Sequence, residues 1–123
     1  MFYKLDNIKE IDLSNFDFSE VTSMHYMLYC YNLEKINFGN ANTSSVKRMS
    51  ALFYNISKLT SLDLSSFDTS SVTTMEGMFY MCTALSSINV SNFNTKNVKT
   101  LRLMFYKCEK LASADTYLHI VQL

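Results

Sequence analysis

Residues 59–84 read LTSLDLSSFDTSSVTTMEGMFYMCTA, and residues 85–110 read LSSINVSNFNTKNVKTLRLMFYKCEK, with 11 of 26 positions identical. The same unit continues towards both ends of the chain with a period of 25 or 26 residues. A fixed period of this length is typical of repeat proteins, in which each repeat forms one supersecondary unit. We therefore predict a single repeat domain over residues 1–123, with repeats at 8–32, 33–58, 59–84 and 85–110. Residues 1–7 are predicted to be the remnant of a preceding repeat, and residues 111–123 a partial repeat and tail.

Each repeat contains two kinds of apolar spacing. In its first half, Leu62 and Leu64 flank a polar residue, which is the period of a strand with one buried face. In its second half, the apolar residues lie at the spacing of a helical stripe, as in Val72, Met75 and Met78. Ser and Thr residues before the second half can accept hydrogen bonds from a first helical turn. Each repeat is therefore predicted to be a strand, a turn and a helix.

Such repeats must stack, because one unit cannot bury its apolar stripe alone. Strands about 4.8 Å apart on one side and helices roughly 10 Å apart on the other would make the stack curve. The expected fold is α/β: a leucine-rich-repeat solenoid of about four strand-turn-helix repeats, with a parallel sheet on the concave side and helices on the convex side. Stacking would place Phe67 between Ala41 and Phe93, and Glu76 opposite Arg102. We also expect residues 117–123 to fold back over the fourth repeat as a cap.

Composition supports a folded domain and argues against several classes of function. Hydrophobic residues make up 48% of the 123 residues and charged residues 18%, which is enough apolar material for a core. Eleven Lys and Arg balance eleven Asp and Glu, so no basic field would attract nucleic acid or anionic lipid. No apolar run approaches the roughly 18–20 residues of a membrane span, and the first residues lack the layout of a signal peptide. We expect no nucleic-acid partner and no membrane insertion.

The sequence offers no catalytic constellation and no cofactor motif. The two histidines, His25 and His119, do not recur in the repeats, and the two glycines, Gly39 and Gly77, form no phosphate-binding loop. The cysteines occupy one column of the repeats, where the second repeat has an aliphatic Ile56, so they are predicted to be buried core thiols. These cysteines are Cys30, Cys82 and Cys108. We expect no enzyme, no cofactor and no metal.

Two columns of acidic and amide residues accompany the predicted strands. On the concave face the first column reads Asp12, Asn37, Asp63, Asn89 and Asp115, and the second, beyond the strand, reads Asp17, Asn42, Asp68 and Asn94. Identical Asp residues about 4.8 Å apart would repel one another, whereas Asn between them supplies donors. The alternation favours a stabilising side-chain ladder. A partner-binding or calcium site on the concave face remains open.

A second candidate surface is a column of tyrosines, each directly after a buried Leu or Phe. Its members are Tyr29, Tyr54, Tyr80 and Tyr106. A tyrosine at the edge of an apolar stripe can pack its ring on the neighbouring repeat and leave its hydroxyl in water. The column is therefore predicted to be structural, with a partner-binding surface as the alternative.

The combined pattern LxxLDLSxFxTSxVxxMxxMFxxC, followed over about residues 1–116, resembles the BspA-like bacterial surface-protein repeat. This branch of the leucine-rich repeats is also described as a mycoplasma lipoprotein-type repeat. The resemblance implies a cell-surface or secreted protein that adheres to host-matrix proteins, host cells or other microbes. We therefore expect a non-enzymatic binding or adhesion module that recognises a protein or glycan. The alternative is a structural spacer or self-assembly fragment of a longer array, in which bare ends associate end to end.

Overall fold

The computed structural model describes residues 2–111, and all of its strands are short and pair in parallel. Strand β1 pairs with β3, β2 with β4, and β5 with β6. The strands are β1 (Phe2–Tyr3), β2 (Glu10–Asp12), β3 (Leu28–Tyr29), β4 (Lys35–Asn37), β5 (Ser61–Asp63) and β6 (Ser87–Asn89). Two expectations, the place of Asp115 in the first acid and amide column and the cap formed by residues 117–123, lie outside the described residues.

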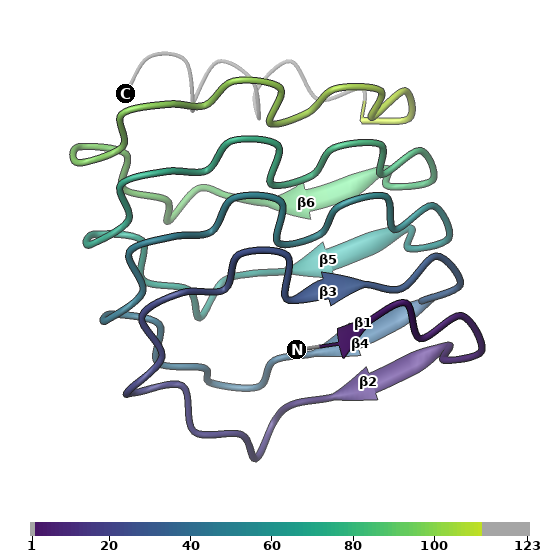
Figure 1. Cartoon of the computed structure of the whole chain (residues 1–123), viewed down its shortest axis with the longest axis horizontal. Helices are drawn as coiled ribbons and strands as arrows, with labels where there is room; N and C mark the ends of the chain where they lie inside the picture. The colour runs from purple at the N-terminus through teal and green to yellow at the C-terminus, as the bar shows by residue number, and fades with distance from the viewer. Residues whose placement is uncertain (1, 112–123) are drawn as a thin grey trace.

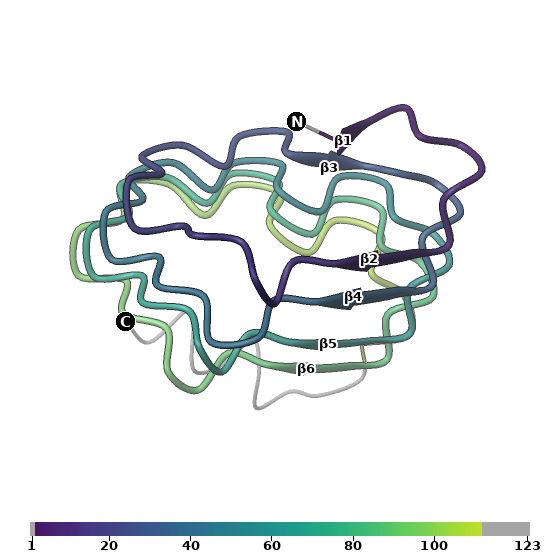
Figure 2. The ribbon, with the colours of Figure 1, turned by 90° about the horizontal axis from the view of Figure 1, so that it is seen from below.

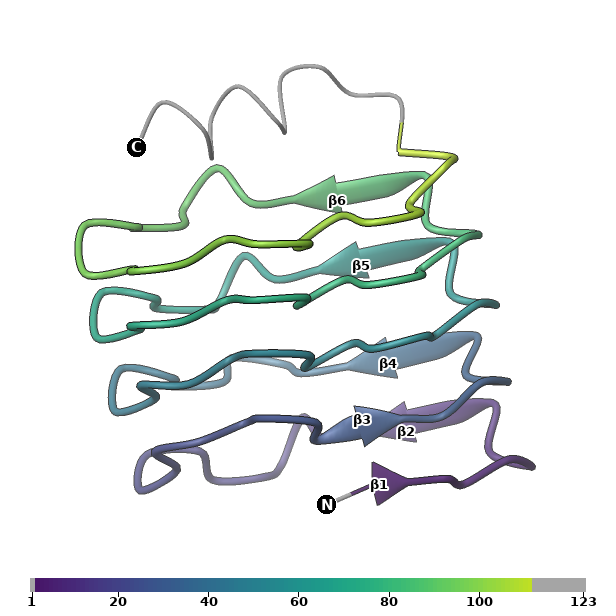
Figure 3. The same ribbon diagram turned by 45° about the horizontal axis from the view of Figure 1, so that its top comes forward.

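Each repeat forms one flattened row, and the rows lie on one another in chain order (Figure 1, Figure 3). One side of the stack, the strand face, carries β2, β4, β5 and β6 (Figure 2). The opposite side, the turn face, carries β1 and β3 and a series of single-residue bridges. These parallel bridges link Ser23 to Arg48, Arg48 to Thr74, and Thr74 to Thr100.

The strand face has the register that the repeat alignment predicts. Ile11 of β2 lies opposite Ile36 of β4, and Leu62 of β5 lies opposite Ile88 of β6. Side chains alternate between the two sides of a strand, so the polar residues next to these positions are exposed, as Asp63 is beside the buried Leu62. The prediction of a short strand in the first half of each repeat is confirmed.

The predicted helices are wrong, because residues 2–111 contain no helix. The second half of each row consists of tight turns, in which Met78 N–H donates to the carbonyl of Met75, three residues earlier. Other amides point to the next row, and Gly77 N–H donates to Arg102 O at 2.9 Å. A helix would direct every amide to the carbonyl four residues earlier in its own row. The turn face is thus held together by hydrogen bonds between rows.

Left-handed backbone conformations separate the turns. In the third row, Gly77 and Met81 have φ of 61° and 59°, and in the fourth row Leu103 and Lys107 have φ of 56° and 58°. A right-handed helix needs φ near about −63° at every residue, so two such positions four residues apart interrupt it. Three of these four residues are not glycine, which is why the sequence does not mark them as turns.

The leucine-rich-repeat solenoid with a convex layer of helices is therefore not the fold of this chain. Without helices, neighbouring rows are hydrogen-bonded on both faces, and the roughly 10 Å helix spacing that was expected to curve the stack does not exist. The column predicted for a concave face lies instead on the strand face, at the ends of β2, β4, β5 and β6, and no helical layer lies opposite within residues 2–111.

The core lies between the two faces and is made of apolar columns. The rings of Phe53 and Phe79 stack with centroids 5.4 Å apart and an interplanar angle of 3°, and Phe79 stacks on Phe105 at 5.3 Å. Phe67 is 2% exposed and contacts Phe38 edge to face, with centroids 4.9 Å apart. Stacking of side chains on their counterparts in adjacent rows is confirmed for Phe53, Phe79 and Phe105, whereas the ring contact of Phe67 is with Phe38 of another column.

The three cysteines are buried, free thiols, as predicted from their shared column. The Cys82 thiol donates to Phe53 O and the Cys108 thiol to Phe79 O, both at 2.9 Å, so each thiol links its row to the preceding one. Burial raises the pKa of Cys82 and raises that of Cys108 to about 11. A thiol that stays protonated is a poor nucleophile and a poor metal ligand, which favours a structural role.

Candidate functional site

The acid and amide column of the strand face caps turns in its own rows. Asp12, Asn37, Asp63 and Asn89 are all exposed, and the Oδ1 of each accepts a hydrogen bond from the backbone N–H two residues later. This is the geometry of an Asx turn, in which a short side chain substitutes for a backbone turn. The hydrogen bonds that Ser14 donates to the Asp12 carboxylate favour its charged form and lower the pKa of Asp12.

The second column repeats this arrangement, since Asp17, Asn42, Asp68 and Asn94 each accept from the amide two residues on. The Oδ1 atoms of both columns therefore accept hydrogen bonds within their own rows, where the sequence had suggested a ladder between rows. Within residues 2–111, no group of three or more His, Cys, Asp or Glu is placed to hold a metal ion. A pocket over β5 and β6 includes Asp63 and Asn89, but their Oδ1 atoms are already engaged.

The tyrosine column forms an unbroken series of ring contacts on the turn face, which we call the tyrosine ladder. It consists of Tyr3, Tyr29, Tyr54, Tyr80 and Tyr106, with successive ring centroids 5.0, 5.6, 4.9 and 4.9 Å apart. Tyr3 is an additional member that the sequence alignment of full repeats did not include. The pairs Tyr3–Tyr29, Tyr54–Tyr80 and Tyr80–Tyr106 are stacked, whereas the rings of Tyr29 and Tyr54 are tilted by 52°.

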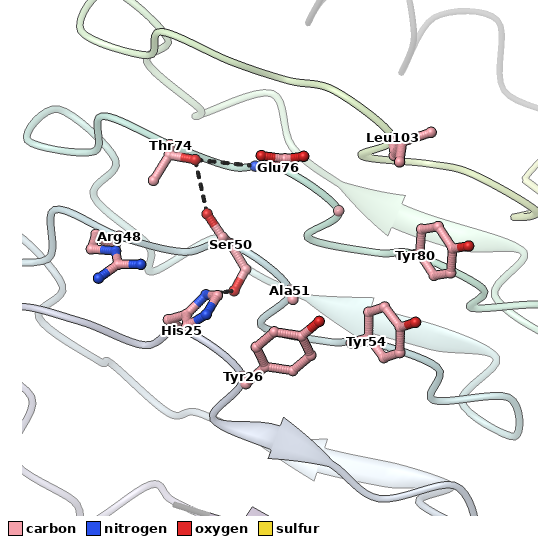
Figure 4. A pocket seen from close by; sticks show the side chains of 11 residues that line it. His25, Tyr26, Arg48, Ser50, Ala51, Tyr54, Thr74, Glu76, Tyr80 and Leu103 are labelled. Carbon is pink, nitrogen blue, oxygen red and sulfur yellow. Dashed lines mark hydrogen bonds between the residues drawn. The ribbon is translucent and has the colours of Figure 1, made fainter.

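A hollow of about 470 Å³ lies beside the ladder (Figure 4). It exists because one column of the turn face has small side chains in the two middle rows, Ala51 and Gly77, and large ones, Tyr26 and Leu103, in the rows on either side. A Cβ added to Gly77 would approach only the Cβ of Tyr80, at 3.7 Å, so the space above this glycine is open. Tyr26 and Leu103 are 39% and 42% exposed and close the two ends.

The two sides of the hollow differ in chemistry. Tyr54 and Tyr80 form one side, with their hydroxyls pointing the same way, and Tyr26 closes against Tyr54 at a centroid distance of 5.3 Å (Figure 4). Burial is the main cause that raises the pKa of Tyr54, and the neighbouring tyrosines raise it further. Its hydroxyl is therefore protonated at neutral pH and can donate a hydrogen bond.

The opposite side is polar and pre-arranged by hydrogen bonds (Figure 4). His25 donates from Nδ1 to Ser50 O at 3.0 Å, and the hydroxyls of Ser50 and Thr74 lie 2.8 Å apart. Glu76 lies beside them, 3.8 Å from Arg102 of the next row. Arg48 completes the lining. This side therefore combines donors, acceptors and hydroxyls that can do both.

The sequence predicted Tyr54 and Tyr80 as candidate contacts but missed Tyr26 and the hollow itself. The available signal was the size of the side chains in one column, Tyr26, Ala51, Gly77 and Leu103, which changes from row to row while the column after it, Met27, Leu52, Met78 and Met104, stays apolar. Tyr29 and Tyr106 lie on the same ladder but outside this hollow.

Rows of parallel strands and turns, stacked through columns of like residues, define a repeat protein. The chain belongs to the family described as Mycoplasma protein of unknown function, DUF285, whose profile matches residues 1–117. The resemblance to a mycoplasma-type repeat is thereby confirmed in this general form. Neither the curated proteins nor the solved structures compared with the chain include a match. Within residues 2–111, no helix is long and apolar enough to cross a membrane.

Proposed function

We propose that this chain is a non-enzymatic binding module of a surface-type repeat protein, and that it recognises a protein or glycan partner with its turn face. The observation that carries the proposal is the hollow, which joins an aromatic side to a polar side on an exposed surface. Binding sites commonly combine apolar and aromatic lining with a few placed polar groups. Tyrosine is also among the residues enriched in the energetically important parts of interfaces.

The turn face fits this role better than the strand face. On the strand face, the Oδ1 atoms of Asp12 and Asp63 cap turns of their own rows by accepting from the amides of Ser14 and Ser65, which gives these residues a structural role. On the turn face, Leu103 and Tyr26 are large, exposed and next to a hollow. Membership of the mycoplasma family supports a location at the cell surface.

A pair of matched variants tests which face binds. Leu103→Glu places a charge at the rim of the hollow, and Ser87→Glu places the same charge on the strand face of the same repeat; both positions are exposed. Wild type and variants are compared on an array of immobilised glycans and extracellular-matrix proteins. We expect at least one ligand whose binding falls about tenfold or more with Leu103→Glu and changes less than about twofold with Ser87→Glu. Absence of any ligand, or greater sensitivity to Ser87→Glu, would contradict the proposal.

End-to-end self-association is a second candidate, favoured by the N-terminal end of the stack. Leu5, Ile8 and Phe16 are 39%, 38% and 41% exposed. Their counterparts in interior rows are almost completely buried, as Leu33 is in the column of Ile8. An exposed group of apolar residues is typical of an interaction site. Sedimentation velocity tests this: growth in mass with concentration that Ile8→Asp abolishes and Ser61→Asp does not would establish self-association, and a constant monomer mass would reject it.

A further inference from the structure

We infer that the hollow between Tyr26 and Leu103 binds a short neutral saccharide of about two or three sugar units. This inference rests on the proposed function and names the class of ligand for the same face. It follows from the size of the hollow, from the hydrogen-bonding state of its backbone, and from the chemistry of its two sides.

The hollow has a definite length. Tyr26 and Leu103 occupy the same column three rows apart, and ladder rings in adjacent rows are 4.9 Å apart where they stack best. The volume of about 470 Å³ falls within the range of about 300–1,000 Å³ that is typical of small-molecule sites. A ligand of a few rings fits between the two closing side chains, whereas a long polymer would have to pass over them.

The backbone of the hollow has no free edge for a peptide strand. Ala51 N–H donates to Glu76 O and Gly77 N–H to Arg102 O, both at 2.9 Å, so these amides are used between rows. Addition of an extended peptide to a sheet depends on unpaired main-chain groups. A ligand in the hollow must therefore be recognised by the side chains of the lining. This suits a ligand whose own polar groups are hydroxyls.

The side chains match a saccharide on both sides. A sugar ring has apolar C–H groups that can make van der Waals contact with Tyr54 and Tyr80, and hydroxyls that both donate and accept. On the polar side, Glu76 accepts, Arg48 donates, and the hydroxyl of Ser50 can do either. Together these groups can meet both the donor and the acceptor of a sugar hydroxyl.

The charges of the lining favour a neutral ligand. Arg48 contributes one positive and Glu76 one negative charge on the same polar side. An anionic ligand would meet Glu76, and a cationic ligand would meet Arg48, so either gains attraction at one group and repulsion at the other. The Arg102 guanidinium, 3.8 Å from Glu76 and outside the lining, partly offsets the Glu76 charge, so a cation gains little at this carboxylate.

The test is a titration of the isotopically labelled chain with lactose, maltose, cellobiose and N,N′-diacetylchitobiose, followed through backbone amide resonances. At least one of these disaccharides is expected to shift the amides of Ala51 and Gly77 in a saturable manner, without shifting those of β5 and β6 on the strand face. If none does so, or if the shifts map to the strand face, the inference is wrong.

Ala51→Leu provides the matched variant. Ala51 already has φ of 53°, and Leu103 has φ of 56° in the same column, so a leucine is compatible with this backbone. It should fill the hollow and weaken saccharide binding about tenfold or more, whereas Ser87→Leu, which adds the same side chain on the strand face, should leave binding unchanged. Unchanged binding by Ala51→Leu would overturn the inference. If binding of the array ligands is still weakened by Leu103→Glu in that case, the proposed binding function stands and only the saccharide inference fails.

Discussion

The rings of Tyr54 and Tyr80 lie parallel, with centroids 4.9 Å apart and an interplanar angle of 0°. This spacing is that of neighbouring strands, about 4.8 Å, although neither residue belongs to a strand. The match arises because Asn55 N–H donates to Tyr80 O and Phe53 N–H donates to Met78 O, so the two rows are hydrogen-bonded on both sides of the tyrosine. Helices on this face would have kept the rings too far apart to stack.

Phe67→Ala should lower the free energy of unfolding by about 3–5 kcal/mol, through lost burial and the cavity that remains. Phe67 is 2% exposed and contacts Phe38. Phe16 occupies the same column at the N-terminal end of the stack, where it is 41% exposed, so Phe16→Ala should cost much less. Urea denaturation measures both, and equal costs would show that Phe67 does not stack inside the core.

Thr69→Val should destabilise the chain by about 1–3 kcal/mol, because two backbone groups lose their partner. The buried Thr69 hydroxyl accepts from Asn94 N–H at 2.7 Å and donates to Asn94 O at 3.1 Å. Thr95 occupies the same column, and within residues 2–111 its buried hydroxyl has no hydrogen-bond partner. Thr95→Val should therefore leave the urea midpoint unchanged or raise it. A loss of stability with Thr95→Val as large as that with Thr69→Val would be inconsistent with this account.

The Glu76–Arg102 pair, expected from stacking of the third and fourth repeats, forms at 3.8 Å with both side chains well exposed. An exposed pair contributes at most about 1 kcal/mol. A double-mutant cycle with Glu76→Gln and Arg102→Gln should therefore give a coupling energy below about 1 kcal/mol that shrinks further in high salt. A larger, salt-insensitive coupling would indicate that the pair is buried.

Stability should decline in alkali because of the buried thiols. The folded Cys108 has a pKa of about 11, raised from 9.0 by burial, and that of Cys82 is raised as well. The folded state therefore holds these protons at pH values where the unfolded state has lost them. The free energy of unfolding is highest below about pH 9 and falls as the pH rises towards about 11.

The control for this pH dependence is the double variant Cys82→Val with Cys108→Val. An aliphatic residue fits the column, because Ile56 already occupies it and is fully buried. Between about pH 9 and 11, the urea midpoint of the variant should fall less steeply than that of the wild type. The raised pKa of Tyr54 acts in both proteins and does not affect the comparison. Parallel curves would show that the thiols do not cause the decline.

The repeat boundaries, the strand columns and the buried cysteines could be predicted from the sequence because they depend on the period alone. In a stack, residues of one column share one environment. Leu62 and Ile88 could therefore be placed opposite one another from the sequence. Cys82 and Cys108 could likewise be assigned to one buried column of free thiols.

The second half of each repeat was misassigned for a physical reason. Consecutive turns with bonds from residue i to i−3, as from Val72 to Thr69 and from Met78 to Met75, bring apolar residues to the core at nearly the spacing of a helical stripe. Positive φ would have distinguished turns from helix, but in most rows it falls on residues such as Met81 and Lys107, which are not typical turn residues. The hollow was missed because it depends on differences between rows, as between Gly77 and Leu103, whereas the alignment emphasises what rows share.

The most direct test of the account concerns the hydrogen bond that builds the turn face and the floor of the hollow. Scalar coupling across hydrogen bonds identifies by NMR the carbonyl that accepts from each amide. For Gly77 N–H the structure predicts coupling to the carbonyl carbon of Arg102 in the next row, where the N···O distance is 2.9 Å. Coupling instead to Thr73, four residues earlier in the same row, would mean that the turn face is helical and would contradict both the fold and the hollow derived from it.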